Sequence, residues 1–112
     1  MKVKTAGSPF GSLTRTRVLV ALALLETSYQ RELSRLLDTS PSVVQKALTG
    51  LERDGLLVGR LIGRTRSYRT NPRYFARTEL DAYLQRLAEA DDDLQARAAA
   101  LRRRPRRAGK PL

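Results

Sequence analysis

The ten residues "TSPSVVQKAL", Thr39–Leu48, predict a well-defined helix start. Ser40 can accept a hydrogen bond from a free backbone N–H of the helix, and Pro41 suits its first position, where a missing N–H would have been unpaired anyway. The expected helix covers residues 41–54 and ends at Gly55, which can take the left-handed conformation that often follows a helix. Its inward face is expected to consist of Val44, Leu48 and Leu51.

The outward face of the same helix is polar, and its side chains are Ser42, Gln45, Lys46 and Thr49. In the major groove of DNA, Gln suits adenine and Lys suits guanine, so a base-reading helix could present this face. For an isolated helix, an ordinary solvated face would be the simpler interpretation. Gly50 lies inside this helix at a cost of about 1 kcal/mol relative to Ala; it either allows close approach of another backbone or is simply tolerated.

The segment after this helix, "LLVGRLIGRTRSYRT" over residues 56–70, predicts a two-stranded hairpin that turns at Gly63. Asp54-Gly55 could form a hairpin turn instead, but the helical period before it favours a helix end. Residues 56–77 contain no acidic side chain and six arginines: Arg60, Arg64, Arg66, Arg69, Arg73 and Arg77. A merely solvated hairpin would mix both signs of charge, so this bias favours a functional wing.

The composition points to a polyanionic partner. The formal net charge is +11 over 112 residues, with a pI near 11.2, and Lys and Arg gain affinity for nucleic acid by releasing its condensed counterions. The chain has no Cys and no His, which removes disulfides, the usual metal ligands and the usual nucleophiles and bases. We therefore expect no metal, no cofactor and no enzymatic activity.

The N-terminal third predicts an arm and two helices. Residues 1–11 are expected to form a flexible arm that Phe10 can pin, and residues 14–26 a helix buried on more than one side. A shorter helix should cover residues 30–37. The longest apolar run, Val18 to Leu25, has eight residues; this is too short to span a bilayer and lacks a signal-peptide pattern, so we expect a soluble cytoplasmic protein without a membrane partner.

The C-terminal part predicts one long helix over residues 78–101. Its apolar residues recur with heptad spacing at Leu80, Leu84, Leu87, Leu94, Ala98 and Leu101. We expect the seam leucines to form a homodimer interface, because one short domain could not cover them. Asp91 fills the missing heptad position; Asp91–Asp93 cannot converge on one ion, so a solvated kink or register device is expected. Residues 102–112 are basic and expected to be disordered.

The stretch "RELSRLLDTSPSVVQKALTGLERDGLLVGRLIGRTRSYRT", residues 31–70, resembles the ArsR-like and MarR-like bacterial and archaeal transcriptional regulators. A Glu-Leu opening, a Ser-x-x-Val recognition helix and an Arg-rich hairpin with a glycine turn recur there in this order. The resemblance implies a mainly α fold with a small β-hairpin (α+β), namely a winged helix-turn-helix over residues 12–77 followed by a C-terminal dimerisation helix. It also implies a dimeric operator-binding protein.

The sequence departs from that pattern at three points. Asp38 stands where the family usually has Gly; Asp visits the left-handed region readily, so the turn should persist. Leu61 and Ile62 occupy the wing tip, where charges are common, and could contact a partner. The Cys and His ligands of metal-sensing members are absent.

These features together predict a sequence-specific regulator of transcription that binds double-stranded DNA, with a repressor expected. Helix 41–54 would read the major groove, and wing 56–70 would contact the backbone or minor groove. The residues expected to make the backbone and wing contacts are Ser40, Arg60, Arg64 and Arg66. Arg73 and Arg77 could equally pair with Glu79 or Asp81. Two alternatives remain: a winged helix that docks proteins through its apolar tip, and an RNA-binding protein, which the scarcity of exposed aromatics disfavours. The tyrosines fit packing better than a pocket, and the small-molecule effector, if one exists, stays unknown.

Overall fold

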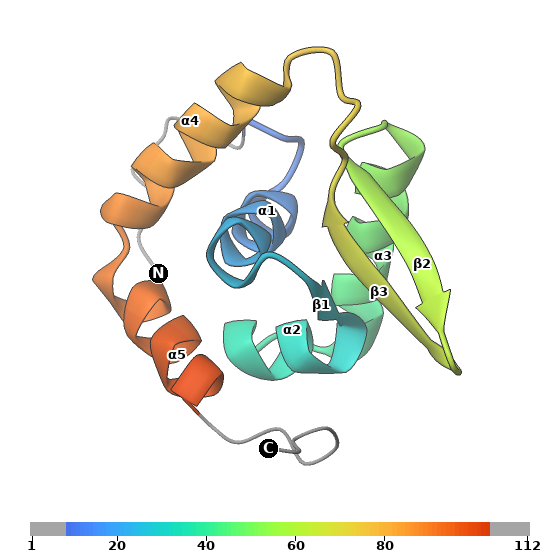
Figure 1. Ribbon diagram of the computed structural model, residues 1–112. Coiled ribbons are helices and arrows are strands. Elements are labelled where there is room, and N and C mark those ends of the chain that lie inside the picture. Colours follow the sequence, from blue (N-terminus) through green and yellow to red (C-terminus); the bar gives the residue numbers. More distant parts are fainter. Residues whose placement is uncertain (1–8, 104–112) are drawn as a thin grey trace.

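The computed structural model describes residues 9–103, which contain five helices and a three-stranded antiparallel sheet (Figure 1). The predicted α+β class is confirmed. In chain order the elements are α1 (Leu13–Leu25), β1 (Ser28–Tyr29), α2 (Gln30–Leu37), α3 (Pro41–Arg53), β2 (Leu57–Ile62), β3 (Thr65–Thr70), α4 (Arg77–Glu89) and α5 (Asp92–Arg103).

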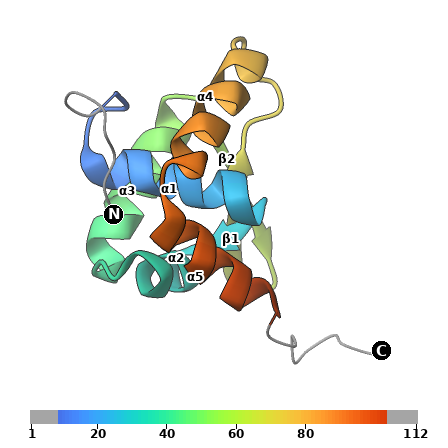
Figure 2. The ribbon, with the colours of Figure 1, turned by 90° about the vertical axis from the view of Figure 1, so that its left-hand side faces the viewer.

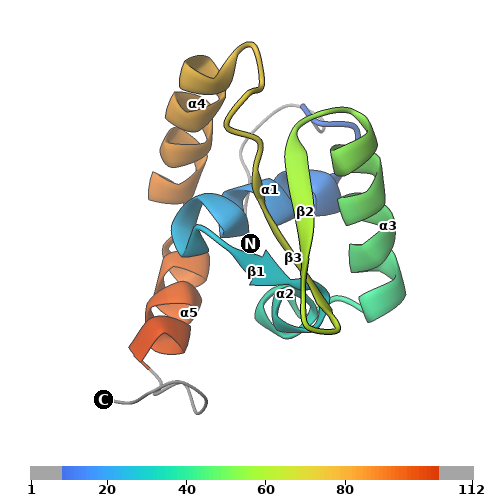
Figure 3. The same cartoon turned by 45° about the vertical axis from the view of Figure 1, so that its right-hand side comes forward.

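Helix α1 forms the centre of the structure. Its residues Val18–Leu22 are at most 1% exposed, so the predicted burial on more than one side is confirmed. Helix α3 and the β2–β3 hairpin lie on one side of α1, and α4 and α5 lie on the other (Figures 1 and 3). Seen from that second side, α4 and α5 pass across α1 as two successive segments (Figure 2). A helix that is apolar on all sides can be stable only when neighbours cover it on all sides.

A three-residue turn connects α2 to α3. Asp38 adopts the left-handed conformation with φ 53°, as predicted for the position where Gly is usual. The Thr39 N–H donates to the Ser34 carbonyl at 3.1 Å, and the Ser34 hydroxyl donates to the Thr39 carbonyl at 2.5 Å. These two bonds close the turn, so a glycine is not needed there.

Helix α3 begins and ends close to the predicted positions. At its end, Gly55 has φ 84° and the Leu56 N–H donates to the Leu51 carbonyl at 2.9 Å, which is a Schellman motif. The hairpin-turn alternative at Asp54-Gly55 is therefore excluded. The predicted side-chain cap by Ser40 is wrong: Val43 N–H donates to the Ser40 carbonyl instead, at 3.1 Å.

Helix α3 is also fastened to α1 by an arginine. The Arg15 guanidinium lies over Gly50, where a Cβ would overlap it, and donates to Asp54 Oδ2 at 3.0 Å and to the Phe10 carbonyl at 3.4 Å. Gly50 therefore permits a close approach, as one of the two interpretations held, but the approaching group is a guanidinium and not a backbone. The Arg15–Asp54 ion pair between α1 and α3 therefore depends on residue 50 having no side chain.

The sheet has the strand order β1-β3-β2. Ile62 pairs with Thr65, which leaves Gly63 and Arg64 as the turn, and Gly63 has φ 66°. The predicted turn is confirmed. The two-residue strand β1, in which Ser28 pairs with Tyr68, was not predicted because two residues carry no recognisable alternation.

The predicted single helix over residues 78–101 is wrong. Helix α4 ends at Glu89 and α5 begins at Asp92. Between them, Asp91 is only 4% exposed, and its Oδ1 accepts a hydrogen bond from the Leu94 N–H at 3.1 Å. Asp91 is thus a buried N-cap that starts a new helix; the expected kink is present, but it is not solvated.

The break directs both helices onto the chain's own core. The seam residues Leu80, Leu84 and Leu94 are buried, while Leu87 and Leu101 are partly buried against the same core. The Arg97 and Arg102 guanidinium groups donate to carbonyls of Leu36 and Leu24 at 2.9 and 2.7 Å, which holds α5 in place. One short domain does cover the seam, so the premise of the dimer interface is wrong, while dimerisation itself stays a prediction.

The two chain ends are described only in part. Phe10 is partly buried and its ring centroid lies 5.9 Å from that of Tyr83, so this ring does pin the start of the described chain. The rest of the predicted arm, residues 1–8, and residues 104–112 of the predicted tail lie outside the described residues. Arg102 and Arg103 belong to α5. Within residues 9–103, no helix is long and apolar enough to cross a membrane.

Leu94→Ala should lower the free energy of unfolding by about 2–5 kcal/mol, the usual cost of a cavity left by a buried leucine. Because Leu94 packs inside one protomer, the loss should not depend on protein concentration between 1 and 100 µM (on the order of a hundredfold range). Urea unfolding measures both quantities, and Arg86→Ala on the exposed surface of α4 is the control, expected within about 0.5 kcal/mol of wild type. A loss that grows on dilution would place Leu94 in an interface between protomers.

Gly50→Ala should have opposite effects in two backgrounds. Alone, the new methyl group displaces the Arg15 guanidinium from Asp54, which offsets the gain in helix propensity and lowers stability. In an Arg15→Ala background the space is empty, and the same change should stabilise by about 1 kcal/mol. A double-mutant cycle by urea unfolding measures the coupling. Equal effects in both backgrounds would show that the guanidinium does not occupy this space.

Candidate nucleic-acid interface

The exposed face of α3 is a polar stripe one residue wide. Ser42, Lys46, Thr49 and Arg53 are exposed and spaced so that they lie along one side of the helix. The opposite side is anchored in the core by Val44, Ala47, Leu48 and Leu51. Val43, beside the stripe, is 44% exposed, so it adds an apolar side chain to the exposed surface of the helix. The hydroxyls of Ser40 and Ser42 lie 3.5 Å apart at the exposed start of the helix.

Gln45 is not part of this free stripe, although it was predicted to read bases. Its Oε1 accepts from Gln30 Nε2 at 3.2 Å, and its Nε2 donates to the Thr49 hydroxyl at 3.1 Å and to the buried Tyr68 hydroxyl at 3.3 Å. Both amide N–H groups and one carbonyl lone pair are engaged. The side chain therefore ties α3 to α2 and β3, and reading a base would require breaking these bonds.

Arg66 is also committed within the chain. Its Nη2 donates to Glu52 Oε2 at 2.7 Å, and the same oxygen accepts the Gly59 N–H at 3.2 Å. The guanidinium lies 5.8 Å from the centroid of the Tyr68 ring. The hydrogen bond and the charge of Glu52 raise the pKa of Arg66. Arg66, predicted as a DNA contact, is thus engaged within the chain, where it holds the hairpin against α3.

Gly59 provides the space for this guanidinium. A Cβ on Gly59 would lie 2.6 Å from Arg66 Nε, well inside van der Waals contact. Gly59 and Gly50 therefore serve the same purpose: each lets an arginine cross a secondary-structure element and reach an acidic residue at the C-terminal end of α3. Neither role was predicted, although a glycine inside a regular element is a signal for such close approach.

The sheet register separates the arginines of the hairpin. Directly paired residues lie on the same face, so Tyr68 and Arg66 share the face that packs on α3, whereas Arg60, paired with Ser67, lies on the other face. Arg60, predicted as a wing contact to the DNA backbone or minor groove, therefore lies on the face of the hairpin that is turned away from α3. Arg64 lies in the turn itself, at the end of the hairpin.

Several cations of α3 and the hairpin, Arg69 among them, have no side-chain partner within the described residues. Within residues 9–103, Lys46, Arg60 and Arg64 are exposed and make no side-chain hydrogen bond or ion pair. The hairpin also presents bare aliphatic side chains, since Leu61 is 64% and Ile62 59% exposed. The tip of the hairpin, defined as residues 61–65, is thus both basic and apolar.

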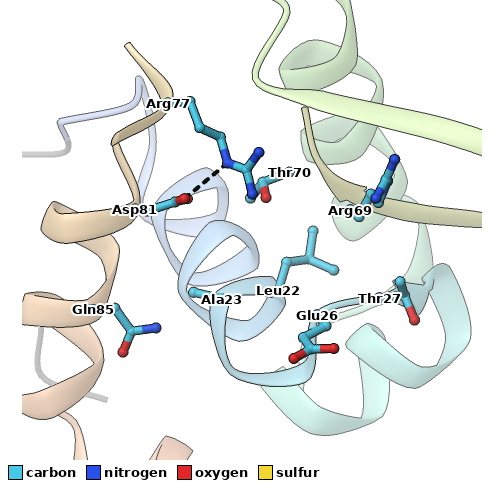
Figure 4. A pocket seen from close by; sticks show the side chains of 9 residues that line it. All are labelled: Leu22, Ala23, Glu26, Thr27, Arg69, Thr70, Arg77, Asp81 and Gln85. Atoms are coloured by element: carbon cyan, nitrogen blue, oxygen red, sulfur yellow. Dashed lines mark hydrogen bonds and ion pairs between the residues drawn. The ribbon is translucent and has the colours of Figure 1, made fainter. Parts of the chain in front are cut away.

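A hollow of about 410 Å³ lies at the base of the hairpin, between α1, β3 and α4 (Figure 4). Its wall holds Glu26 and Arg69 together with Arg77 and Asp81, which pair at 2.9 Å. Of the alternatives for Arg77, pairing with Asp81 is therefore confirmed. None of the four tyrosines lines this hollow, and the described residues contain no group of three acidic side chains arranged to hold a metal.

No protein-family model, no curated protein and no solved structure matches this chain. The function is therefore inferred from the geometry of the chain itself.

Gln45→Ala should lower the free energy of unfolding by about 1–2 kcal/mol, because the buried Tyr68 hydroxyl loses its partner. The neighbouring Lys46→Ala, on the free stripe, should stay within about 0.5 kcal/mol of wild type. Urea unfolding of both variants tests the assignment of Gln45 as a structural tie. If Gln45→Ala were as stable as Lys46→Ala, the amide would be free to read bases, as the helical pattern alone predicts.

Proposed function

We propose that this chain is a winged helix-turn-helix protein that binds double-stranded DNA and regulates transcription, acting as a repressor that occupies its operator. In this proposal α3 enters the major groove, and the hairpin is the wing that contacts the adjacent backbone or minor groove. The observation that carries the proposal is the exposed polar stripe of α3 beside a hairpin that has no acidic residue and whose Arg60 and Arg64 have no partner among the described residues.

The arrangement of the elements supports this proposal. A three-residue turn separates α2 from α3, as in a helix-turn-helix. The major groove, about 12 Å wide, admits one α-helix. Helix α3 presents its polar side chains outward and is fixed by Arg15, Gln45 and Glu52, so its orientation is reproducible. Fixed orientation is what a side chain needs in order to discriminate between bases.

Lys46 replaces Gln45 as the leading base-reading residue. It lies on the second turn of α3, is exposed and has no partner within the described residues. Lysine donates to the O6 and N7 acceptors of guanine in the major groove. Ser42 and Thr49 flank it on the same stripe, and their short hydroxyls can contact bases or phosphates.

A homodimer remains part of the proposal, but it needs a surface other than the seam leucines of α4 and α5. Operator symmetry would report on it: a dimer favours two half-sites about one helical turn apart. A single half-site would indicate that one chain binds alone.

Selection of bound duplexes from random DNA should yield a preferred sequence. On that sequence Lys46→Ala should cost about 1–3 kcal/mol and relax the preference at one base pair. Arg64→Ala should weaken binding to preferred and scrambled duplexes by similar factors and lower the salt slope by about 1. Fluorescence anisotropy titrations at several salt concentrations measure both effects.

Two outcomes would contradict the proposal. If no duplex is enriched and binding to DNA is undetectable at low salt, the chain is not a DNA-binding protein, and the protein-docking alternative gains. If Lys46→Ala leaves the ratio of preferred to scrambled binding unchanged, α3 does not read bases through Lys46.

A further inference from the structure

The tip of the hairpin exposes two aliphatic side chains that nothing in the described part of the chain covers. Leu61 and Ile62 end strand β2 and are 64% and 59% exposed. Their cross-strand partners are Arg66 and Thr65, and the Arg66 guanidinium is held by Glu52. Because neighbouring residues of a strand point to opposite faces, the two aliphatic groups lie on both sides of the tip.

The surroundings of this pair are strongly basic. Arg64 forms the turn next to Ile62, and Arg60 lies on the same sheet face as Ile62. Both guanidinium groups lack a partner within residues 9–103, and residues 56–76 contain no acidic side chain. The charge of this surface therefore fits a polyanionic partner. Because Leu61 and Ile62 lie exposed between the cations, the partner should also offer an apolar surface that these two side chains can contact.

We infer that Leu61 and Ile62 form an apolar wedge that enters the minor groove of DNA and partly unstacks one base step, so that the protein bends its operator. This inference rests on the proposed DNA-binding function and deepens it. Exposed Leu and Ile side chains that enter a minor groove separate base steps and kink the duplex toward the major groove. Arg60 and Arg64 would contact the phosphates that border the opened step.

The size of the tip supports a wedge rather than a passive contact. The minor groove of regular DNA is about 6 Å wide. The two strands of a hairpin are about 4.8 Å apart between backbones alone, before side chains are added. Such a tip cannot enter the groove deeply unless the groove widens, and unstacking with a bend supplies that widening. The preferred step should therefore be a flexible pyrimidine–purine step such as TA or CA/TG.

The fold provides a rigid base for the wedge. The hairpin is fixed to α3 through Glu52, Gly59 and Arg66, and to β1 through the pairing of Ser28 with Tyr68. A tip on a loose hairpin would fold away from the groove instead of separating bases. Here α3 and the tip move as one body, so docking α3 brings the tip to the neighbouring groove.

The test uses the full chain and the duplex obtained by selection, labelled with a fluorophore at each end. Energy transfer reports the end-to-end distance, and 2-aminopurine placed at the central step reports unstacking. Wild type should shorten the end-to-end distance by the amount expected for a bend of about 20–90° and raise the 2-aminopurine fluorescence. The variant Leu61→Thr/Ile62→Thr keeps two β-favouring residues, and its thermal melting should match that of wild type.

This double variant should lose the bend and the 2-aminopurine signal, and its Kd should rise about tenfold. The matched control is Arg64→Ala, which should also raise the Kd but still bend the duplex and unstack the step when saturating. Loss of the signals in the double variant, with both signals kept in the control, supports the wedge.

The remaining outcomes contradict the wedge, and they show whether the wedge alone is wrong or the proposed DNA-binding function as well. If wild type binds the duplex without bending it, or if the double variant bends it equally, the wedge is wrong while DNA binding stands. If wild type binds no duplex at all, the proposed function and the wedge fall together.

Discussion

The all-round burial of α1 is the constraint on which the rest of the structure depends. Its central residues are apolar on every side and have almost no exposed surface, so a single neighbouring layer cannot stabilise it. Helix α3 and the hairpin cover one side, and α4 and α5 cover the other. The apolar residues of the C-terminal heptads supply this second cover. Because the helix is interrupted at Asp91, the two short helices α4 and α5 both pack against the core. One straight helix would have extended beyond the core.

The arginines of the chain divide into two groups with different roles. Arg15 and Arg66 each cross a glycine and pair with an acidic residue at the C-terminal end of α3. Their role is structural, because both charges are paired within the chain. The two ion pairs hold α3 against α1 and against the hairpin. Arg60 and Arg64 have no such partner among the described residues and leave their charge for a ligand. The two structural arginines thus fix the position of α3 and of the hairpin that carries Arg60 and Arg64.

The sequence was sufficient for the parts of the fold that depend on local signals. Helix α3 begins at Pro41 and ends just before Gly55. Asp38 adopts the left-handed conformation in the turn before α3, and Gly63 adopts a positive φ in the hairpin turn. Each position is decided by the backbone preference of a single residue. The predictions that depended on side-chain partners fared differently, because a partner far along the chain has no local signature. Gln45 belongs to the polar face on a helical wheel, but Gln30 and Tyr68 engage its amide. Periodicity therefore gave the face correctly, and tertiary contact decided whether the side chain was available.

The charge of the described chain is distributed unevenly around α1. Residues 77–103, which form α4 and α5, carry six acidic and five basic side chains, whereas residues 9–76 carry eleven basic and five acidic ones. Since α4 and α5 lie on the far side of α1 from α3 and the hairpin (Figure 3), the excess of positive charge in the described chain does not lie on the side of α4 and α5. An uneven distribution of this kind would orient the chain before contact in the field of a polyanion, the class of partner proposed above.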